Sequence, residues 1–128
     1  MIGYVTLGTN DLEKAAAFYD DLFAVIGVKR SIESENYFVG WGPGDDQPGI
    51  GVTRPFDGMP ASVGNGVMVA LAVKDKDTVH RVHRKALELG GTDEGAPGYR
   101  NAVSGFYGGY FRDLDGNKLN AFCMAPES

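Results

Sequence analysis

Residues 107–124 read YGGYFRDLDGNKLNAFCM and contain the clearest turn signal of the chain. A strand-like run ends at Arg112, the turn DLDGN follows, and a second run begins at Lys118. Asp and Gly-Asn tolerate the left-handed backbone that a tight hairpin needs. The stretch therefore predicts two antiparallel strands, and alternation along the second strand places Asn120 on the face opposite to Leu119 and Ala121.

Working outward from this hairpin, a strand followed by a helix and a glycine occurs twice, and the two copies align without a gap at an offset of 64 residues. Tyr4 falls on Met68 in this alignment. Each copy is followed by three more strand-like segments, which are KRSIES, YFVGW and IGVTRP in the first half and a glycine-rich stretch, FYGGYFR and KLNAFCM in the second. The repeat predicts an α+β fold of two βαβββ units. Their expected bounds are 1–54 and 66–125, with a Pro- and Gly-rich linker at 55–65, all within a single domain, 1–128.

The helix starts are marked by residues that accept hydrogen bonds from free backbone N–H groups. Thr9 or Asn10 is the expected cap of the first helix, and Asp75 or Asp77 that of the second. Apolar residues recur behind each cap at the spacing of an amphipathic helix, so each helix is expected to pack one face against its sheet.

Composition excludes several classes of function. The net charge is −5, and no basic cluster is present, so nucleic-acid binding is not expected. No apolar run approaches the roughly 20 residues of a membrane span, and the first residues lack the pattern of a signal peptide. The single cysteine, Cys123, fits a reducing cytoplasm.

The segment FRDLDGNKLN is similar to the Asp-Pro-Asp-Gly-Asn turn of the vicinal oxygen chelate superfamily, with Leu114 in place of the usual Pro. The segment VTLGTNDLEKAAAFY resembles the opening strand and helix of the same family, which includes glyoxalase I, bleomycin-resistance proteins and extradiol dioxygenases. The resemblance covers essentially the whole chain. It implies curled mixed sheets with their helices outside and a ligand held at a cavity on the inner faces.

Strand alternation then indicates which residues face that cavity. Val5, Leu7, Val69 and Leu71 form the apolar set that must cover the helices. The residues expected on the cavity side are Tyr4, Thr6, Met68, Ala70, Ala72, Lys118, Asn120 and Phe122. For the strand near residues 49–54, either Ile50, Val52 and Arg54 or Gly51 and Thr53 face the cavity.

Catalytic members of the family chelate a divalent ion at four strand positions, usually through His, Glu or Gln. The matching positions here are Tyr4, Ile50 or Gly51, Met68 and Asn120. A thioether, a phenol and an amide are poor substitutes for imidazole and carboxylate. The resemblance therefore implies a member without the usual metal ligands, and no cofactor is expected.

Other groups that bind metals or ligands are interpreted as structural. His80 and His83 are expected to be a solvated pair on the second helix, and Asp45 to Gln47 to be turn residues. Trp41 is assigned to the core or to a dimer interface, and Cys123 to a structural role.

Further candidate ligand contacts lie near residues 95–110, which we expect to be a glycine-rich loop running into a strand. Arg100 is the only cation of this segment and stands among Tyr99, Tyr107 and Tyr110, so it could grip a carboxylate or an aromatic ring. The expected ligand-binding set is Tyr4, Thr6, Met68, Asn120, Phe122, Arg100, Tyr107 and Arg54.

The expected function is that of a glyoxalase/bleomycin-resistance-like protein. It would bind a small organic molecule without a metal, in a cleft built by a homodimer. The alternative is a glyoxalase-like lyase or isomerase, or a dioxygenase-type enzyme, with a non-standard or metal-free site. The sequence leaves open the identity of the ligand and whether the paired units come from one chain or two.

Overall fold

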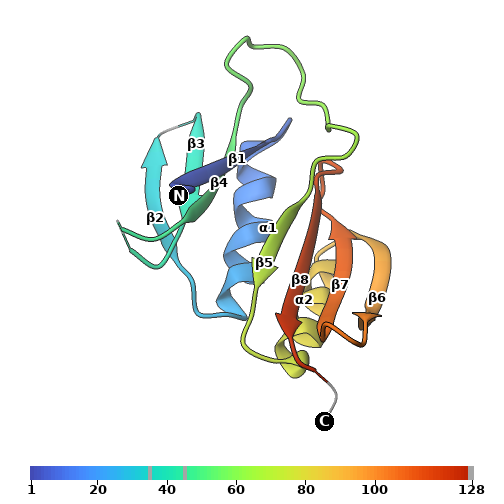
Figure 1. Ribbon diagram of the computed structural model, residues 1–128. Helices are drawn as coiled ribbons and strands as arrows, with labels where there is room; N and C mark the ends of the chain where they lie inside the picture. The colour runs from blue at the N-terminus through green and yellow to red at the C-terminus, as the bar shows by residue number, and fades with distance from the viewer. Residues whose placement is uncertain (35, 45, 127–128) are drawn as a thin grey trace.

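The computed structural model describes residues 1–34, 36–44 and 46–126. The first unit contains β1 (Tyr4–Gly8), α1 (Leu12–Ala24), β2 (Arg30–Ser34), β3 (Phe38–Trp41) and β4 (Gly49–Thr53). The second contains β5 (Val69–Ala72), α2 (Lys76–Glu88), β6 (Thr92–Asn101), β7 (Phe106–Arg112) and β8 (Lys118–Met124). Figure 1 shows the two units side by side, joined by an extended linker.

Each unit forms its own four-stranded mixed sheet with the same topology. Sheet A has the order β1-β4-β3-β2, and sheet B has the order β5-β8-β7-β6. In each sheet the first strand pairs in parallel with the last, and the other pairs are antiparallel. The predicted α+β fold with a repeated βαβββ order is confirmed. The two sheets remain separate and do not close into a barrel.

Both helices begin at an aspartate. Asp11 caps α1 by accepting a hydrogen bond from the backbone N–H of Lys14, at 3.1 Å. The expected cap at Thr9 or Asn10 is therefore wrong, because the Thr9 hydroxyl instead accepts from the N–H of Asp11 and holds the cap residue. Asp75 caps α2 as one of the two predicted candidates, through the N–H of Thr78 at 2.9 Å.

The glycine-rich stretch that we expected to be a loop is largely a strand. Residues Gly95–Asn101 belong to β6 and pair with β7, with register shifts along the way. Gly95 has a φ of +154°, a backbone conformation that residues with a side chain rarely adopt. Local composition indicated a loop, but hydrogen bonding to β7 decides the structure.

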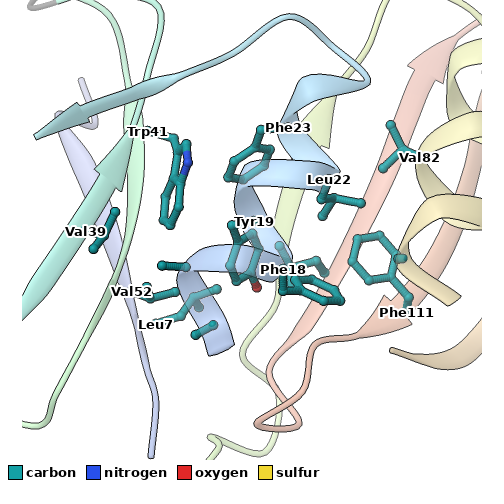
Figure 2. Packing of buried hydrophobic residues seen from close by; sticks show 14 of the residues in the cluster. Leu7, Phe18, Tyr19, Leu22, Phe23, Val39, Trp41, Val52, Val82 and Phe111 are labelled. Atoms are coloured by element: carbon teal, nitrogen blue, oxygen red, sulfur yellow. The ribbon is translucent and has the colours of Figure 1, made fainter. Parts of the chain in front are cut away.

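The core lies between the two sheets and is centred on α1. Figure 2 shows Val39, Trp41 and Val52 of sheet A on one side of α1, and Val82 and Phe111 of the second unit on the other. All of these residues belong to one buried cluster, together with Phe18, Tyr19, Leu22 and Phe23 of α1. The helix-covered faces of both sheets thus share a single core. The opposite face of each sheet, named here its open face, points away from that core.

The DLDGN turn of the second unit is fastened to the first unit. The Tyr19 hydroxyl donates to Asp113 Oδ2 at 2.6 Å, and Asn117 Nδ2 donates to the carbonyl of Gly8 at 3.0 Å. The N–H of Asn10 donates to Asp115 Oδ1 at 2.9 Å. Because Asp113 also accepts from the N–H groups of residues 115 and 117, the turn is held both internally and across the units.

Candidate functional site

The register of sheet B places a connected set of side chains on its open face. Phe111, Leu119 and Ala121 belong to the buried core, so the residues alternating with them face the other way. Across the ladder, Ala70 pairs with Asn120, and Asn120 pairs with Tyr110. The open face of sheet B includes Ala70, Ala72, Phe106, Gly108, Tyr110, Lys118, Asn120 and Phe122, together with Met124 and with Arg112, which pairs with Glu94.

Asn120 is the most unusual residue of this face. Its exposed fraction is 0%, and neither the amide nitrogen nor the amide oxygen has a hydrogen-bond partner among the described residues. A buried polar group without a partner costs about 1–3 kcal/mol. Such groups are rare in folded proteins and call for a structural or functional reason.

Two cations flank Tyr110 on the open face of sheet B. The Arg100 guanidinium lies 5.0 Å and the Lys118 ammonium 5.6 Å from the centroid of the Tyr110 ring. Arg100 also donates to the carbonyls of Ala96 and Gly98, which fixes the guanidinium beside the ring. Neither cation forms an ion pair with a carboxylate in the described part of the chain.

An aromatic pair lies next to this cationic cluster. Phe106 and Phe122 stack with their centroids 5.1 Å apart and an angle of 6° between the rings. Gly108 lies between Phe106 and Tyr110 along β7, and a Cβ there would stand 3.2 Å from Phe106 and 3.4 Å from Cβ of Phe122. The glycine thus makes room for the stacked pair on the open face.

The open face of sheet A resolves the question of register near residues 49–54. Thr6 pairs with Gly51, whereas Leu7 pairs with Val52, which is buried in the core. Gly51 and Thr53 therefore lie on the same face as Tyr4 and Thr6. The Tyr4 side chain is 70% exposed on this face.

The structure separates the expected ligand-binding residues into groups. Asn120, Phe122 and Arg100 lie together on the open face of sheet B, whereas Tyr4 and Thr6 lie on the open face of sheet A. Met68 lies just before β5 and lines an apolar groove.

Arg54 and Tyr107 lie elsewhere. Arg54 follows β4 and lines a polar groove with Asp11 and Glu13 at the start of α1. Tyr107 alternates with the open-face residues of β7, and its hydroxyl lies 2.6 Å from Nε2 of His80 on α2. Neither residue is close to the Tyr110 cluster in this arrangement.

The expected ligand-binding set did not include Phe106, Tyr110 or Lys118, which supply the aromatic and cationic contacts of this open face. The signal that could have found two of them is alternation around Phe111. Because Phe111 is the residue of FYGGYFR best suited to the core, its neighbour Tyr110 and the residue at 106 must face the other way. Sequence alone did not show that Lys118 and Arg100, eighteen residues apart, approach the same ring.

The second helix carries a histidine that the sequence interpretation placed wrongly. His83 is not solvated: it is 6% exposed, and its Nε2 lies 3.0 Å from Asp93 Oδ1. The N–H of Gly95 and the His83 ring hold the pKa of Asp93 below its usual value. Because sheet B packs against α2, the side of the helix that carries His83 is buried.

Trp41 and Cys123 are both buried, as expected for structural residues. Trp41 lies in the core and donates from Nε1 to Asp20 Oδ1 at 2.9 Å. Cys123 is buried, and this burial raises the pKa of its thiol. A neutral thiol is a weak nucleophile.

The residues at the metal positions of the family do not fit a divalent cation. Tyr4 lies on sheet A, Met68 and Asn120 belong to the second unit, and the β4 position carries Gly51 on the open face. None of these supplies a carboxylate or imidazole. Over the described residues, no group of three or more His, Cys, Asp or Glu side chains is placed to hold a metal ion. Asp45 lies outside the described residues, so the expectation for residues 45–47 is only partly covered.

Neither α1 nor α2 has the length and apolar character needed to cross a bilayer, within the part of the chain that is described.

Comparison with known proteins gives a consistent result over nearly the full chain. The profile of the Glyoxalase/Bleomycin resistance protein/Dioxygenase superfamily matches residues 1–121. A glyoxalase/bleomycin resistance protein from Albidiferax ferrireducens T118 is 31% identical, with a TM-score of 0.87 over 96% of this chain and 98% of that one. No protein of curated function matches the sequence.

More distant solved structures share the fold. A hypothetical protein from S. aureus is 28% identical, with a TM-score of 0.72 over 94% of this chain and 91% of that one. A lactoylglutathione lyase from Agrobacterium tumefaciens is 22% identical, with a TM-score of 0.69 over 96% of this chain and 92% of that one. At that identity, the likeness to the lyase concerns the fold alone.

Proposed function

Because the chain belongs to the Glyoxalase/Bleomycin resistance protein/Dioxygenase superfamily, we propose that it binds a small organic molecule on the open face of sheet B without using a metal ion. The observation that carries this proposal is Asn120, whose buried amide has no hydrogen-bond partner within the part of the chain that the structure describes. A bound molecule that satisfies the amide would account for a polar group that weakens the free protein. The aromatic and cationic residues around it supply the contacts that small-molecule sites use.

The metal-free part of the proposal rests on the donor set rather than on any missing atom. Tyr4, Met68 and Asn120 are the only side chains with a donor atom at the corresponding positions, and a glycine stands at the fourth. Elemental analysis of protein purified without chelators tests this part. We expect substoichiometric zinc, nickel, iron and manganese, and one divalent ion per chain would favour the alternative of a glyoxalase-like enzyme.

Ligand binding is tested by screening small aromatic molecules against the protein by thermal shift and by NMR. We expect compounds that perturb residues of the open face of sheet B, and the variant Asn120→Leu should bind more weakly those that hydrogen-bond to the Asn120 amide. The matched control is Asn65→Leu, because Asn65 is an exposed linker residue. If no compound that perturbs this face binds more weakly to Asn120→Leu than to the wild type, the role of Asn120 in the proposed site is wrong.

We also propose that the protein is a homodimer, as the sequence analysis predicted. An apolar groove of about 720 Å³ follows β5 and the start of β1, and it is lined by Ile2, Val5, Ile50, Met68, Val69 and Leu71 among others. Both β1 and β5 are edge strands, and edges of this kind are commonly covered by pairing. Pairing sheet A of one chain with sheet B of the other would bring Tyr4 and Thr6 to the same cavity as Asn120.

Sedimentation equilibrium tests the dimer. The wild type is expected at twice the chain mass of 13.7 kDa, and Ile2→Asp with Met68→Asp should yield single chains. Val103→Asp is the control, since Val103 is 96% exposed and lies in the turn between β6 and β7. A wild type that sediments as a single chain at all concentrations would show that the site must be complete in one chain.

The lone buried Cys123 supports a reducing cytoplasm as the proposed compartment.

A further inference from the structure

The chemistry of the open face of sheet B narrows the class of molecule that it can hold, provided that the proposed function is right. The protein carries a net charge of −5, yet this face presents two cations, Arg100 and Lys118, without a carboxylate partner among the described residues. Both lie close to one ring, at 5.0 and 5.6 Å from the centroid of Tyr110. A surface of this kind favours an anion, because each cation retains hydrogen-bond donors for it.

The same face also favours a flat, apolar body. Phe106 and Phe122 are stacked nearly parallel, at an angle of 6°, and Phe122 lies two residues from Asn120 on β8. Aromatic side chains prefer offset-stacked partners with centroids about 4.5–7 Å apart. An aromatic ligand can extend this stack while its anionic group reaches the cations beside Tyr110.

Asn120 adds a requirement for a polar substituent. Its amide offers a donor and an acceptor, and neither is hydrogen-bonded to any of the described residues. An acceptor such as a carboxylate oxygen satisfies only the nitrogen, whereas a hydroxyl group on the ligand can donate to the oxygen. Access to the amide depends on movement of Lys118 or Tyr110, which flank Asn120 on this face and are only partly buried.

From these three features we infer that the ligand is a planar aromatic carboxylate that carries a hydroxyl group. The carboxylate binds to the cationic pair of Arg100 and Lys118 beside Tyr110, the ring stacks on Phe122, and the hydroxyl donates to the Asn120 oxygen.

Binding of three naphthalene probes tests the inference by calorimetry, with NMR to locate the site. We expect 6-hydroxy-2-naphthoate to bind more tightly than 2-naphthoate, and 2-naphthoate to bind about tenfold more tightly than the neutral 2-naphthamide. Raising the salt concentration should weaken both naphthoates and leave the amide unchanged.

Variants assign each part of the preference to a residue. Arg100→Gln and Lys118→Gln should each weaken 2-naphthoate several-fold and leave 2-naphthamide unchanged. Arg84→Gln is the matched control, because Arg84 is an exposed residue of α2. Asn120→Leu should remove the advantage of the hydroxylated probe over 2-naphthoate.

Two results would overturn the inference about the ligand class, and only in combination with a further result would the proposed function also be wrong. If 2-naphthamide perturbs the open face of sheet B and binds as tightly as 2-naphthoate, the anionic class is wrong while the proposed function survives. If none of the probes perturbs Tyr110, Asn120 or Phe122, the ligand class is wrong. If in addition the broader aromatic screen finds no compound on this face, the proposed function is wrong as well.

Discussion

Equivalent positions of the two units carry Gly51 in sheet A and Asn120 in sheet B. Thr6 and Ala70 match at the repeat offset, Thr6 pairs with Gly51, and Ala70 pairs with Asn120. In sheet A a Cβ on residue 51 would stand only 2.4 Å from the Phe38 ring, so an aromatic side chain covers a glycine. In sheet B the equivalent position carries Asn120, a buried amide that has no hydrogen-bond partner among the described residues. The glycine of this face is Gly108, which lies on the neighbouring strand β7.

The difference indicates that the two repeated units have different roles, one mainly in the core and the other in the candidate ligand site. The first unit supplies most of the core, because α1 buries seven residues, including Phe18, Tyr19 and Phe23. The second unit has a more polar helix, whose buried set includes Thr78 and His83. Its open face carries the cations and the amide. Stability thus depends more on the first unit, and the candidate ligand chemistry belongs to the second.

The largest expected effect tests the role of α1 in the core. Phe23→Ala should lower the free energy of unfolding by about 3–5 kcal/mol, because it leaves a cavity beside Trp41. Val82→Ala in α2 should cost about 2 kcal/mol, since it removes fewer buried carbon atoms. Urea denaturation measures both, and an equal or larger loss for Val82→Ala would contradict the division between the units.

Grafting the second unit's residue onto the first gives the next effect. Gly51→Asn should destabilise the protein by about 1–3 kcal/mol through overpacking against Phe38. Adding Phe38→Ala should recover part of this loss, because it removes the ring that occupies the space. Thermal melts of the single and double variants check the coupling, and simple additivity would show that Phe38 is not the obstacle.

Removing the unsatisfied amide should stabilise the free protein. Asn120→Leu replaces a buried polar side chain by an apolar one of similar size, and we expect a gain of about 1–2 kcal/mol. A rise in Tm together with lost probe binding would show that Asn120 is retained for function. A fall in Tm would mean that Asn120 has a structural role that its contacts do not reveal.

The smallest expected effect concerns the hydrogen bond between Tyr19 of the first unit and Asp113 of the second. Tyr19→Phe should cost about 1–2 kcal/mol at neutral pH, since it removes the hydrogen bond to Asp113. Burial, reinforced by Asp113, raises the pKa of the Tyr19 phenol well above its usual value. This raised pKa stabilises the fold fully below pH ~10, where an unfolded tyrosine is still protonated, and the contribution is lost as the pH rises above that value.

The Tm of the wild type should therefore fall more steeply than that of Tyr19→Phe as the pH rises above about 10. Tyr4→Phe serves as the control, because Tyr4 is 70% exposed. Parallel curves for the wild type and Tyr19→Phe would show that the phenol does not titrate on unfolding.

The sequence by itself determined the repeated βαβββ order, the hairpin at DLDGN and the facing of Asn120. These follow from local signals: alternation in strands, spacing in helices and the turn preferences of Asp, Gly and Asn. It also indicated that the family's metal ligands are replaced, since donor chemistry is readable from residue type.

Only the tertiary structure decided which groups meet. The side chains of Arg100 and Lys118 both lie close to the Tyr110 ring because β6, β7 and β8 are neighbours in sheet B. Tyr107 lies on the face of β7 opposite to Tyr110, because side chains alternate along a strand. Arg54 follows β4 and lines the groove at the start of α1. His83 is buried because sheet B packs against α2. Such contacts join residues far apart in the chain, so no local pattern encodes them, and the unpartnered state of Asn120 appears only once every neighbour is in place.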